Sequence, residues 1–374
     1  MSLEGPIRIE GRGPVALALR LLLAREGIAA RAVSAEDAQA ELPDWLARRP
    51  IALSLGSLQL LARVAPGLSP VALAAGGTLA APILKVDISR QSIPGHAQID
   101  CTELAEPLVG AVIRYGHLVS TLQEALRASD PPERRSDPSE PNEVYALEVI
   151  ADGEAERGSM AERHFSQMAL LAEVSVSADR RGIAYERFTS EGPLALLPLP
   201  ESNRRALVWC APEPLARERA AALPAAFNQS LERAFGPALG RMEVVGSRHV
   251  GSVSRRTGPI LRAARQVAIG NAAQALHPVA GQGLNLGLRD AAALAKTLGD
   301  VLAAEVSLDR ALERFARQRQ SDRAIVMGTT DLLATWTCFD SLGPAHMLGL
   351  AGIGACAPLR KALARAFMHG PRLL

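Results

Sequence analysis

The chain has 374 residues, 48% of them hydrophobic, which is typical of a globular protein and excludes a disordered one. Its formal net charge at pH 7 is +2, and no basic run is interleaved with aromatic residues, so electrostatics give no reason to expect a nucleic-acid partner. The length is generous for a single compact core and favours two interlocked domains.

The first unit is predicted to be a strand, a glycine turn and a helix. A short strand begins at Ile7, and the turn GRGPVA at residues 11–16 opens a helix that should end near Gly27, before a second strand at 28–33. This βαβ opening is the context that the dinucleotide fingerprint requires. There the first glycine allows a tight turn, the second lets the backbone approach a pyrophosphate, and the helix N-terminus supplies partial positive charge.

Two features of this unit count against a standard dinucleotide site. Arg8 and Glu10 lie in a strand that should be buried on both faces and therefore continuously apolar. An acidic residue should end the second strand and bind the ribose hydroxyls, but Ser34 falls there by spacing and Glu36 comes two residues late.

The next elements alternate between helical and strand-like patterns. Residues 48–68 and 108–128 have apolar residues at helical spacing, while 82–89 and 98–100 are strand-like. The segment 129–143 holds four prolines and seven charged residues, which predicts a surface loop or disordered linker.

The rest of the chain is predicted to be a sheet followed by helices. A strand at about 144–150 ends in an Asp-Gly turn, and the alternating segments within 165–260 suit an antiparallel sheet. Helical patterning covers 215–240 and most of the chain from Leu288 onward. Trp209 and Phe188 are interpreted as sheet core, and Glu186 with Arg187 as a solvated face.

A glycine-rich stretch, GNAAQALHPVAGQGLNLGLRD at residues 270–290, stands directly before one of these helices. Such a loop leaves backbone N–H groups free at the helix start, where an anion or an electron-rich ring edge can bind. Gly281, Gln282 and Gly283 allow a ligand to approach bare backbone, and Asn285 can cap the helix or bind the ligand.

This stretch resembles the second flavin-binding motif of the FAD-dependent aromatic hydroxylases of the p-hydroxybenzoate hydroxylase type. Its Gly-Asn-Ala-Ala-Gln start, followed by Leu-His-Pro, resembles the ubiquinone-biosynthesis branch, the octaprenyl-methoxyphenol hydroxylases. Four further stretches resemble the same branch: RRPIALSLGSLQLLARV, AYERFTSEGPLALLPLP, ALVWCAP and SLDRALERFARQRQSDR. The resemblance covers nearly the whole chain and is strongest from 183 to 323.

The resemblance implies an α/β fold, in which an FAD-binding Rossmann-like domain is interleaved with an antiparallel β-sheet substrate domain and followed by C-terminal helices. The FAD-binding domain would comprise 1–80, 101–164 and 263–330, the substrate domain 81–100 and 165–262, and the C-terminal helical segment 331–374. In that arrangement the charged loop at 129–143 belongs to the FAD-binding domain.

The resemblance also implies the residues that bind FAD. They are Gly11, Gly13 and Ala16 at the pyrophosphate, Arg49 near flavin or pyrophosphate, the Asp152-Gly153 turn, Gly270 and Asn271, and around the isoalloxazine Pro278, Gly281, Gln282, Gly283 and Asn285. No certain catalytic residue and no metal-ligand spacing emerge. For His277 two interpretations stay open, a contact with flavin or substrate and a loop histidine bonded to backbone. For the pair Glu186 and Arg187, interpreted above as a solvated face, the resemblance implies a place where the substrate domain meets the flavin.

The implied reaction is the hydroxylation of a polyprenylated phenol, with NAD(P)H reducing FAD and O2 as the oxidant. Such a substrate requires an apolar tunnel and access to a membrane surface, directly or through a biosynthetic complex. No run of about 18 apolar residues could span a bilayer, and no signal peptide opens the chain. The four scattered cysteines are interpreted as reduced. A cytoplasmic protein, peripheral to the inner membrane at most, is expected.

Two alternatives remain at this level. Ser34, the charged first strand and the loop at 129–143, which replaces a longer segment of the family, favour a relative with weak or no FAD binding that acts as an accessory protein. The residues 154–156 also depart from the family, because they replace a usual serine after Asp-Gly. Losing one hydrogen bond from the ribose to a charged group costs about 1.5–3 kcal/mol, or roughly 10- to 150-fold in affinity. A flavoenzyme acting on a soluble phenol is the third possibility.

Overall fold

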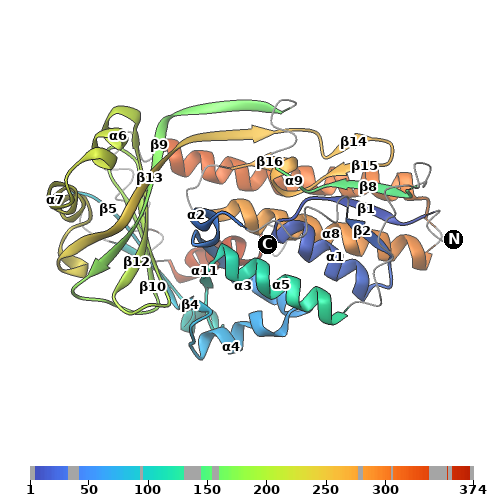
Figure 1. Cartoon of the computed structure of the whole chain (residues 1–374), viewed down its shortest axis with the longest axis horizontal. Coiled ribbons are helices and arrows are strands. Elements are labelled where there is room, and N and C mark those ends of the chain that lie inside the picture. Colours follow the sequence, from blue (N-terminus) through green and yellow to red (C-terminus); the bar gives the residue numbers. More distant parts are fainter. Residues whose placement is uncertain are drawn as a thin grey trace.

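The computed structural model describes residues 5–32, 42–92, 96–129, 145–153, 160–276, 281–304, 306–336, 352 and 356–370. Figure 1 shows a large sheet at one end of the long axis and a smaller sheet, layered with long helices, at the other. Several sequence expectations lie outside the described residues: those on Ser34, Glu36, the loop from 130, the residues 154–156, His277 and Pro278.

The smaller sheet has five strands in the order β14-β15-β8-β1-β2. These are β1 (Ile7–Glu10), β2 (Ala30–Ala32), β8 (Leu147–Ile150), β14 (Leu261–Ala263) and β15 (Gln266–Ala268). Four of them run parallel, and β14 is antiparallel. The helices α1 (Pro14–Arg25), α8 (Gln282–Ala304) and α9 (Leu308–Trp336) accompany this sheet, and α1 and α8 bury their apolar residues with it in one core. The predicted βαβ opening is confirmed.

The charged first strand has a simple structural explanation. Ile7 and Ile9 are fully buried towards the helices, whereas Arg8 and Glu10 point to the opposite face and keep accessible surface. Arg8 lies in register with Glu148 of β8, and their side chains form an ion pair of 3.0 Å. The expectation of a strand buried on both faces is therefore wrong, because the described elements cover only one face of this sheet.

Replacing Arg8 by methionine is accordingly expected to change the free energy of unfolding by less than about 1 kcal/mol, because the pair with Glu148 is screened by water. The side chains are 38% and 27% exposed, respectively. Urea denaturation of the two proteins measures the difference. A loss of several kcal/mol would mean that this face is desolvated in solution.

The larger sheet has eight strands in the order β16-β13-β9-β12-β11-β10-β5-β6. They are β5 (Lys85–Arg90), β6 (His96–Asp100), β9 (Ala161–Val176), β10 (Ile183–Phe188), β11 (Pro193–Pro198), β12 (Arg204–Pro212), β13 (Met242–Thr257) and β16 (Gln274–Ala275). All neighbours pair antiparallel except β5 with β10. The helices α6 (Glu213–Ala221) and α7 (Pro224–Phe235) lie on its outer side (Figure 1). Trp209 packs there against Phe227, as predicted for a core residue.

A third sheet of three strands corrects two sequence predictions. Within the predicted helices at 48–68 and 108–128, the structure has β3 (Pro50–Ser54) and β7 (Gly110–Arg114), which pair with each other and, through β7, with β4 (Ala80–Ile83). The helices α3 (Leu55–Ala62) and α5 (Tyr115–Ser129) begin only after them. A short apolar run is compatible with the periodicity of a helix and with that of a strand. Here the runs form strands because segments far apart in the sequence pair with each other.

The remaining elements are short or peripheral. They are α2 (Asp44–Ala47), η2 (Pro66–Leu68), α4 (Pro70–Ala74), η3 (Thr102–Leu104), η5 (Pro237–Leu239), η6 (Gly270–Ala272) and α11 (Ala357–His369). None of the helices in the described part of the chain is long and apolar enough to cross a membrane.

Candidate cofactor and substrate cavity

Three loops meet where the parallel strands β1, β8 and β15 end. They are the turns after Glu10, after Ile150 and after Ala268. A Cβ added to Gly11, whose φ is +127°, would lie 2.9 Å from the carbonyl carbon of Ala151, and one added to Gly153 would lie 2.4 Å from Asn271 Cβ. The loops therefore pack backbone to backbone, and they form a crevice at the carboxyl ends of the strands, where open α/β sheets bind their ligands.

The N-terminus of α1 opens into this crevice without a cap. The helix begins at Pro14 after Gly13, whose backbone is extended, and no side chain in the described part of the chain caps it. The first backbone N–H groups of a helix have no partner within it, and they carry the positive end of its dipole. No acidic residue lies in the first turn. The end is therefore suited to an anion such as a diphosphate.

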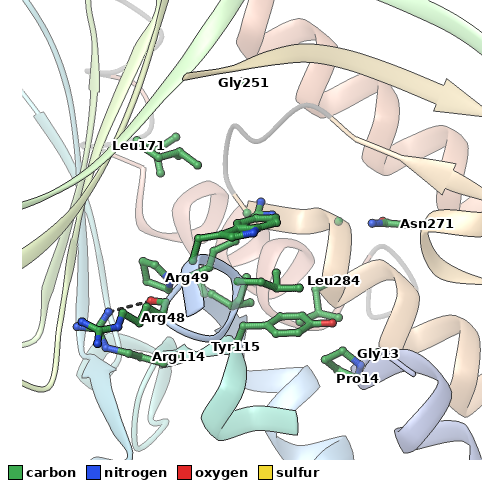
Figure 2. A pocket seen from close by; sticks show the side chains of 18 of the residues that line it. Gly13, Pro14, Arg48, Arg49, Arg114, Tyr115, Leu171, Gly251, Asn271 and Leu284 are labelled. Carbon is green, nitrogen blue, oxygen red and sulfur yellow. Dashed lines mark hydrogen bonds between the residues drawn. The ribbon is translucent and has the colours of Figure 1, made fainter. Parts of the chain in front are cut away.

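One cavity of about 1980 Å³ extends from this crevice to the eight-stranded sheet. A pocket for a single small ligand usually has roughly 300–1,000 Å³. Figure 2 shows Gly13, Pro14 and Asn271 on one side of it and Leu171 of β9 on the other. The cavity can therefore hold a dinucleotide together with a second molecule.

Most of the predicted cofactor residues line this cavity. They are Gly11, Gly13, Arg49, Asp152, Gly153, Gly270, Asn271, Gly281, Gln282 and Gly283. Ala16 does not line it, because its side chain is fully buried within α1 and the sheet. Pro278 and His277 lie outside the described residues.

The side chain of Asn285 forms hydrogen bonds with the backbone of β3, which the sequence did not indicate. Its Oδ1 accepts a hydrogen bond of 2.9 Å from Ser54 N at the end of β3, and its Nδ2 donates to Ala52 O at 3.1 Å and Gly281 O at 2.9 Å. The side chain is 2% exposed and does not line the cavity. Asn285 thus fastens the start of α8, and with it the glycine loop, to β3.

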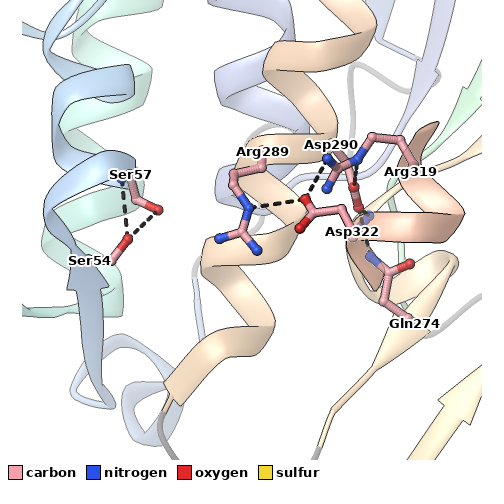
Figure 3. A network of polar contacts seen from close by, with 8 residues as sticks. Ser54, Ser57, Gln274, Arg289, Asp290, Arg319 and Asp322 are labelled. Atoms are coloured by element: carbon pink, nitrogen blue, oxygen red, sulfur yellow. Dashed lines mark hydrogen bonds and ion pairs between the residues drawn. The ribbon is translucent and has the colours of Figure 1, made fainter. Parts of the chain in front are cut away.

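A buried network of ion pairs and hydrogen bonds joins Gln274, Asp290, Arg319 and Asp322 (Figure 3). Asp290 Oδ2 accepts hydrogen bonds from Gly270 N at 3.1 Å and from Gln274 Nε2 at 2.7 Å. Its Oδ1 binds Arg319 Nε at 2.6 Å, and Arg319 also pairs with Asp322 at 2.6 Å. Burial alone would lower the pKa of Arg319, but the two carboxylates outweigh it and raise it. The network ties α8 and α9 to the loop that carries Asn271.

The far wall of the cavity is mostly apolar. It is formed by side chains of the eight-stranded sheet, among them Ala169, Leu171, Ala195, Leu197 and Val208. Its charged edge is an ion-pair group in which Arg114 binds Glu173 at 2.5 Å and Glu201 at 3.0 Å and also donates to Arg48 O at 2.8 Å. This group joins β7 to the larger sheet and gives both carboxylates a cationic partner.

The interpretation of Glu186 and Arg187 as one solvated face is wrong, because the two side chains lie on opposite faces of β10. Within β10 the neighbouring Arg187 points away from the cavity, where it donates to Ala234 O at 3.0 Å and Ser89 Oγ at 3.3 Å. Glu186 instead lines the cavity, and its side chain keeps some accessible surface only because this space is open. Burial raises the pKa of Glu186 to about 7.

Other cavity residues carried no signal in the sequence. Tyr115 begins α5 next to the glycine turn, and a Cβ on Gly13 would lie 3.2 Å from its hydroxyl oxygen. Burial raises the pKa of Tyr115. Trp45 of α2 also lines the cavity although it is 62% exposed. The pattern of 108–128 predicts one continuous helix. The turn between β7 and α5, which places Tyr115 at the cavity, was therefore not expected.

Comparisons with known proteins agree with this site. Residues 151–326 match the family model described as the FAD binding domain. The chain is 35% identical to ubiquinone hydroxylase UbiL of Rhodospirillum rubrum over 211 residues, which are 54% of this chain and 48% of that protein. It is 28% identical to 3-demethoxyubiquinol 3-hydroxylase of Escherichia coli over 266 residues, 63% of this chain and 66% of that protein. The chain thus spans less than two thirds of the length of these relatives.

The fold is shared with solved flavoenzymes. PqsL of Pseudomonas aeruginosa, a probable FAD-dependent monooxygenase, superposes with a TM-score of 0.71 at 18% identity, over 92% of this chain and 99% of that one. The predicted fold class is confirmed, and so is the resemblance on which it rested. The domain match confirms FAD as the cofactor type.

Proposed function

Because residues 151–326 belong to the FAD binding domain family and the chain has the fold of p-hydroxybenzoate hydroxylase-like monooxygenases, we propose that it is an FAD-dependent aromatic hydroxylase. Its substrate would be a polyprenylated phenol of ubiquinone biosynthesis, with NAD(P)H and O2 as co-substrates. The observation that carries the proposal is the single cavity, which joins an uncapped helix N-terminus and three glycine loops to an apolar sheet wall.

The residues present fit FAD. The diphosphate would lie against Gly11, Gly13 and the start of α1, since that helix end offers free N–H groups and no acid. The isoalloxazine would lie near Gly281 and Gly283, where no side chain fills the space at the start of α8. When bound, FAD supplies the redox and oxygen-transfer chemistry, while the protein positions the phenol and excludes water.

Flavin retention separates the enzyme from an accessory protein without cofactor. The purified chain is incubated with excess FAD, desalted and examined by visible absorption. Retained flavin bands, followed by NAD(P)H- and O2-dependent hydroxylation of a prenylated phenol detected by mass spectrometry, would support the proposal. A colourless protein would overturn it in favour of the accessory role. Faster turnover of a short, unprenylated phenol would favour a soluble substrate.

The helix α11 supports a peripheral contact with an anionic lipid surface. Leu359, Leu363 and Phe367 recur every fourth residue and are 45%, 45% and 37% exposed. Phe367 also lines the cavity, so this apolar stripe leads to the substrate space. The helix carries Arg365 and other basic residues but no acidic one, which complements anionic headgroups.

Replacing Leu363 by serine is expected to weaken binding to vesicles that contain anionic phospholipid by about tenfold, because a buried leucine contributes about 1.5 kcal/mol or more. Co-sedimentation at low salt measures this. Leu302→Ser is the matched control, since Leu302 is 37% exposed on α8, outside the stripe. If the wild-type chain does not sediment with such vesicles, the membrane contact is wrong, whereas the flavin proposal stands.

A further inference from the structure

Glu186 is a carboxylate in the apolar wall of the cavity. It stands at the middle of β10, between Ala195 of β11 and Ile88 of β5, which are its partners in the sheet. Among the residues that the structure describes, none donates a hydrogen bond to it or forms an ion pair with it. A carboxylate in such surroundings is costly unless a ligand supplies the missing partner.

The surrounding charges do not satisfy Glu186. The strand β11 holds no charged residue, and Arg187 is engaged on the other side of the sheet. On β5, Lys85 pairs with Asp100, Asp87 accepts from Gln98, and the buried Arg90 has interactions of its own. The same cavity is also lined by His249 and Arg256 of β13, by Arg204 of β12, and by Glu173 and Glu201, both of which pair with Arg114. Burial is the cause of the raised pKa of Glu186, which is about 7.

We infer that Glu186 accepts the proton of the substrate's phenolic hydroxyl, an inference that rests on the proposed function. In this step the phenolic O–H bond breaks, the proton moves to a carboxylate oxygen of Glu186, and the electron pair stays on the phenolate oxygen. The phenolate ring is richer in electrons and therefore more reactive towards an electrophilic oxygen. The proton leaves Glu186 for solvent after the product departs.

The environment of Glu186 suits this step better than that of the other cavity carboxylates. A phenol has a pKa of about 10 and an ordinary glutamate one of about 4.3, a difference of almost six orders of magnitude in acidity. With a pKa of about 7, the difference for Glu186 falls to roughly three orders of magnitude. Glu173 is already engaged in an ion pair with Arg114. Burial alone would raise the pKa of Glu201, but hydrogen bonds from the backbone and from Arg114 lower it, which makes Glu201 a weaker base.

Ligand binding without turnover tests the contact itself. FAD-loaded protein is titrated with p-cresol and with its methyl ether in the absence of NAD(P)H, by calorimetry. Above pH 7 p-cresol should bind roughly 10- to 150-fold tighter than the ether, because a hydrogen bond to a charged group contributes that much. The preference should shrink as pH falls through about 7, since protonation removes the charged acceptor. In Glu186→Gln the preference should be small and independent of pH.

Turnover tests the proton transfer. Glu186→Gln is expected to lower the hydroxylation rate by about 10²- to 10⁴-fold and to abolish its rise with pH near 7, while NAD(P)H still reduces the flavin. Glu186→Asp should restore the pH dependence at a lower rate. The matched control is Glu243→Gln, an exposed position on β13 outside the cavity. Above pH 7, Glu186→Gln should melt no lower than wild type, because it removes an ionised group from the apolar wall of the cavity and breaks no side-chain hydrogen bond or ion pair in the described part of the chain.

The outcomes separate this inference from the proposed function. If the wild type hydroxylates its phenol and Glu186→Gln keeps both the pH dependence and the preference for p-cresol, Glu186 is only part of the wall. If the wild type prefers p-cresol through Glu186 but yields no hydroxylated product from any phenol, the hydroxylase proposal fails and Glu186 remains the acceptor of a phenol-binding site.

Discussion

Replacing Arg319 by methionine is expected to lower the free energy of unfolding by about 3–5 kcal/mol, because the buried carboxylate of Asp290 loses its ion-pair partner and that of Asp322 keeps only Arg289, at 3.3 Å. Arg319, Asp290 and Asp322 are only 3–4% exposed, so water cannot take over the role of the guanidinium. Urea denaturation followed by circular dichroism measures the loss. Arg217→Met is the matched control: its ion pair with Glu213 on α6 is exposed, and it should contribute less than about 1 kcal/mol.

The same network gives Arg319→Met a second effect, on the loop that carries Asn271, which we propose binds flavin. Asp290 holds Gly270 N and Gln274, so its displacement should loosen the loop with Asn271 and reduce flavin retention. A double variant that adds Asp290→Asn removes the charge left unpaired, whereas Asp322 keeps its ion pair with Arg289, and should recover part of the lost stability. Equal instability of the single and double variants would mean that packing, not charge, dominates at Arg319.

Replacing Asn285 by alanine is expected to cost about 3 kcal/mol and to weaken flavin retention. A buried donor without a partner costs about 1–3 kcal/mol, and Ser54 N would become such a donor. The two carbonyl oxygens of Ala52 and Gly281 would each lose a bond of about 1 kcal/mol. Thermal unfolding with and without FAD measures both effects, since a ligand that binds only the folded state raises Tm.

The control for Asn285→Ala is Asn228→Ala. Asn228 Oδ1 accepts from Val244 N at 2.9 Å, in the helix-covered part of the larger sheet and away from the cavity. This change should cost about 1 kcal/mol and leave flavin retention unaltered. If Asn285→Ala retains FAD as well as Asn228→Ala does, the start of α8 does not depend on β3 for its position.

Local patterns in the sequence were sufficient for the βαβ unit, the antiparallel sheet and most of the loops that line the cavity. The glycine spacing at 11–16 predicts a turn because only a residue without Cβ can take the φ of +127° at Gly11 and approach Ala151 so closely. Alternation in 165–260 predicts strands because it repeats every second residue over long segments. These signals depend on neighbours within one element.

Other features were decided by contacts between distant segments. The sequence PIALS at 50–54 became a strand because GAVIR at 110–114 pairs with it. Arg8 could lie in a parallel strand because Glu148, far along the chain, stands beside it on an open face. The side chain of Asn285 binds backbone rather than ligand because β3 ends next to the start of α8.

The sequence by itself therefore determined which segments form the crevice at the strand ends and which family they resemble. Only the tertiary structure decided which side chains enter the cavity. Glu186 and Arg187 are adjacent and equally charged in magnitude, yet successive residues of a strand point to opposite faces. Which face meets the cavity depends on how the eight-stranded sheet packs against the rest of the molecule, and no local pattern specifies that.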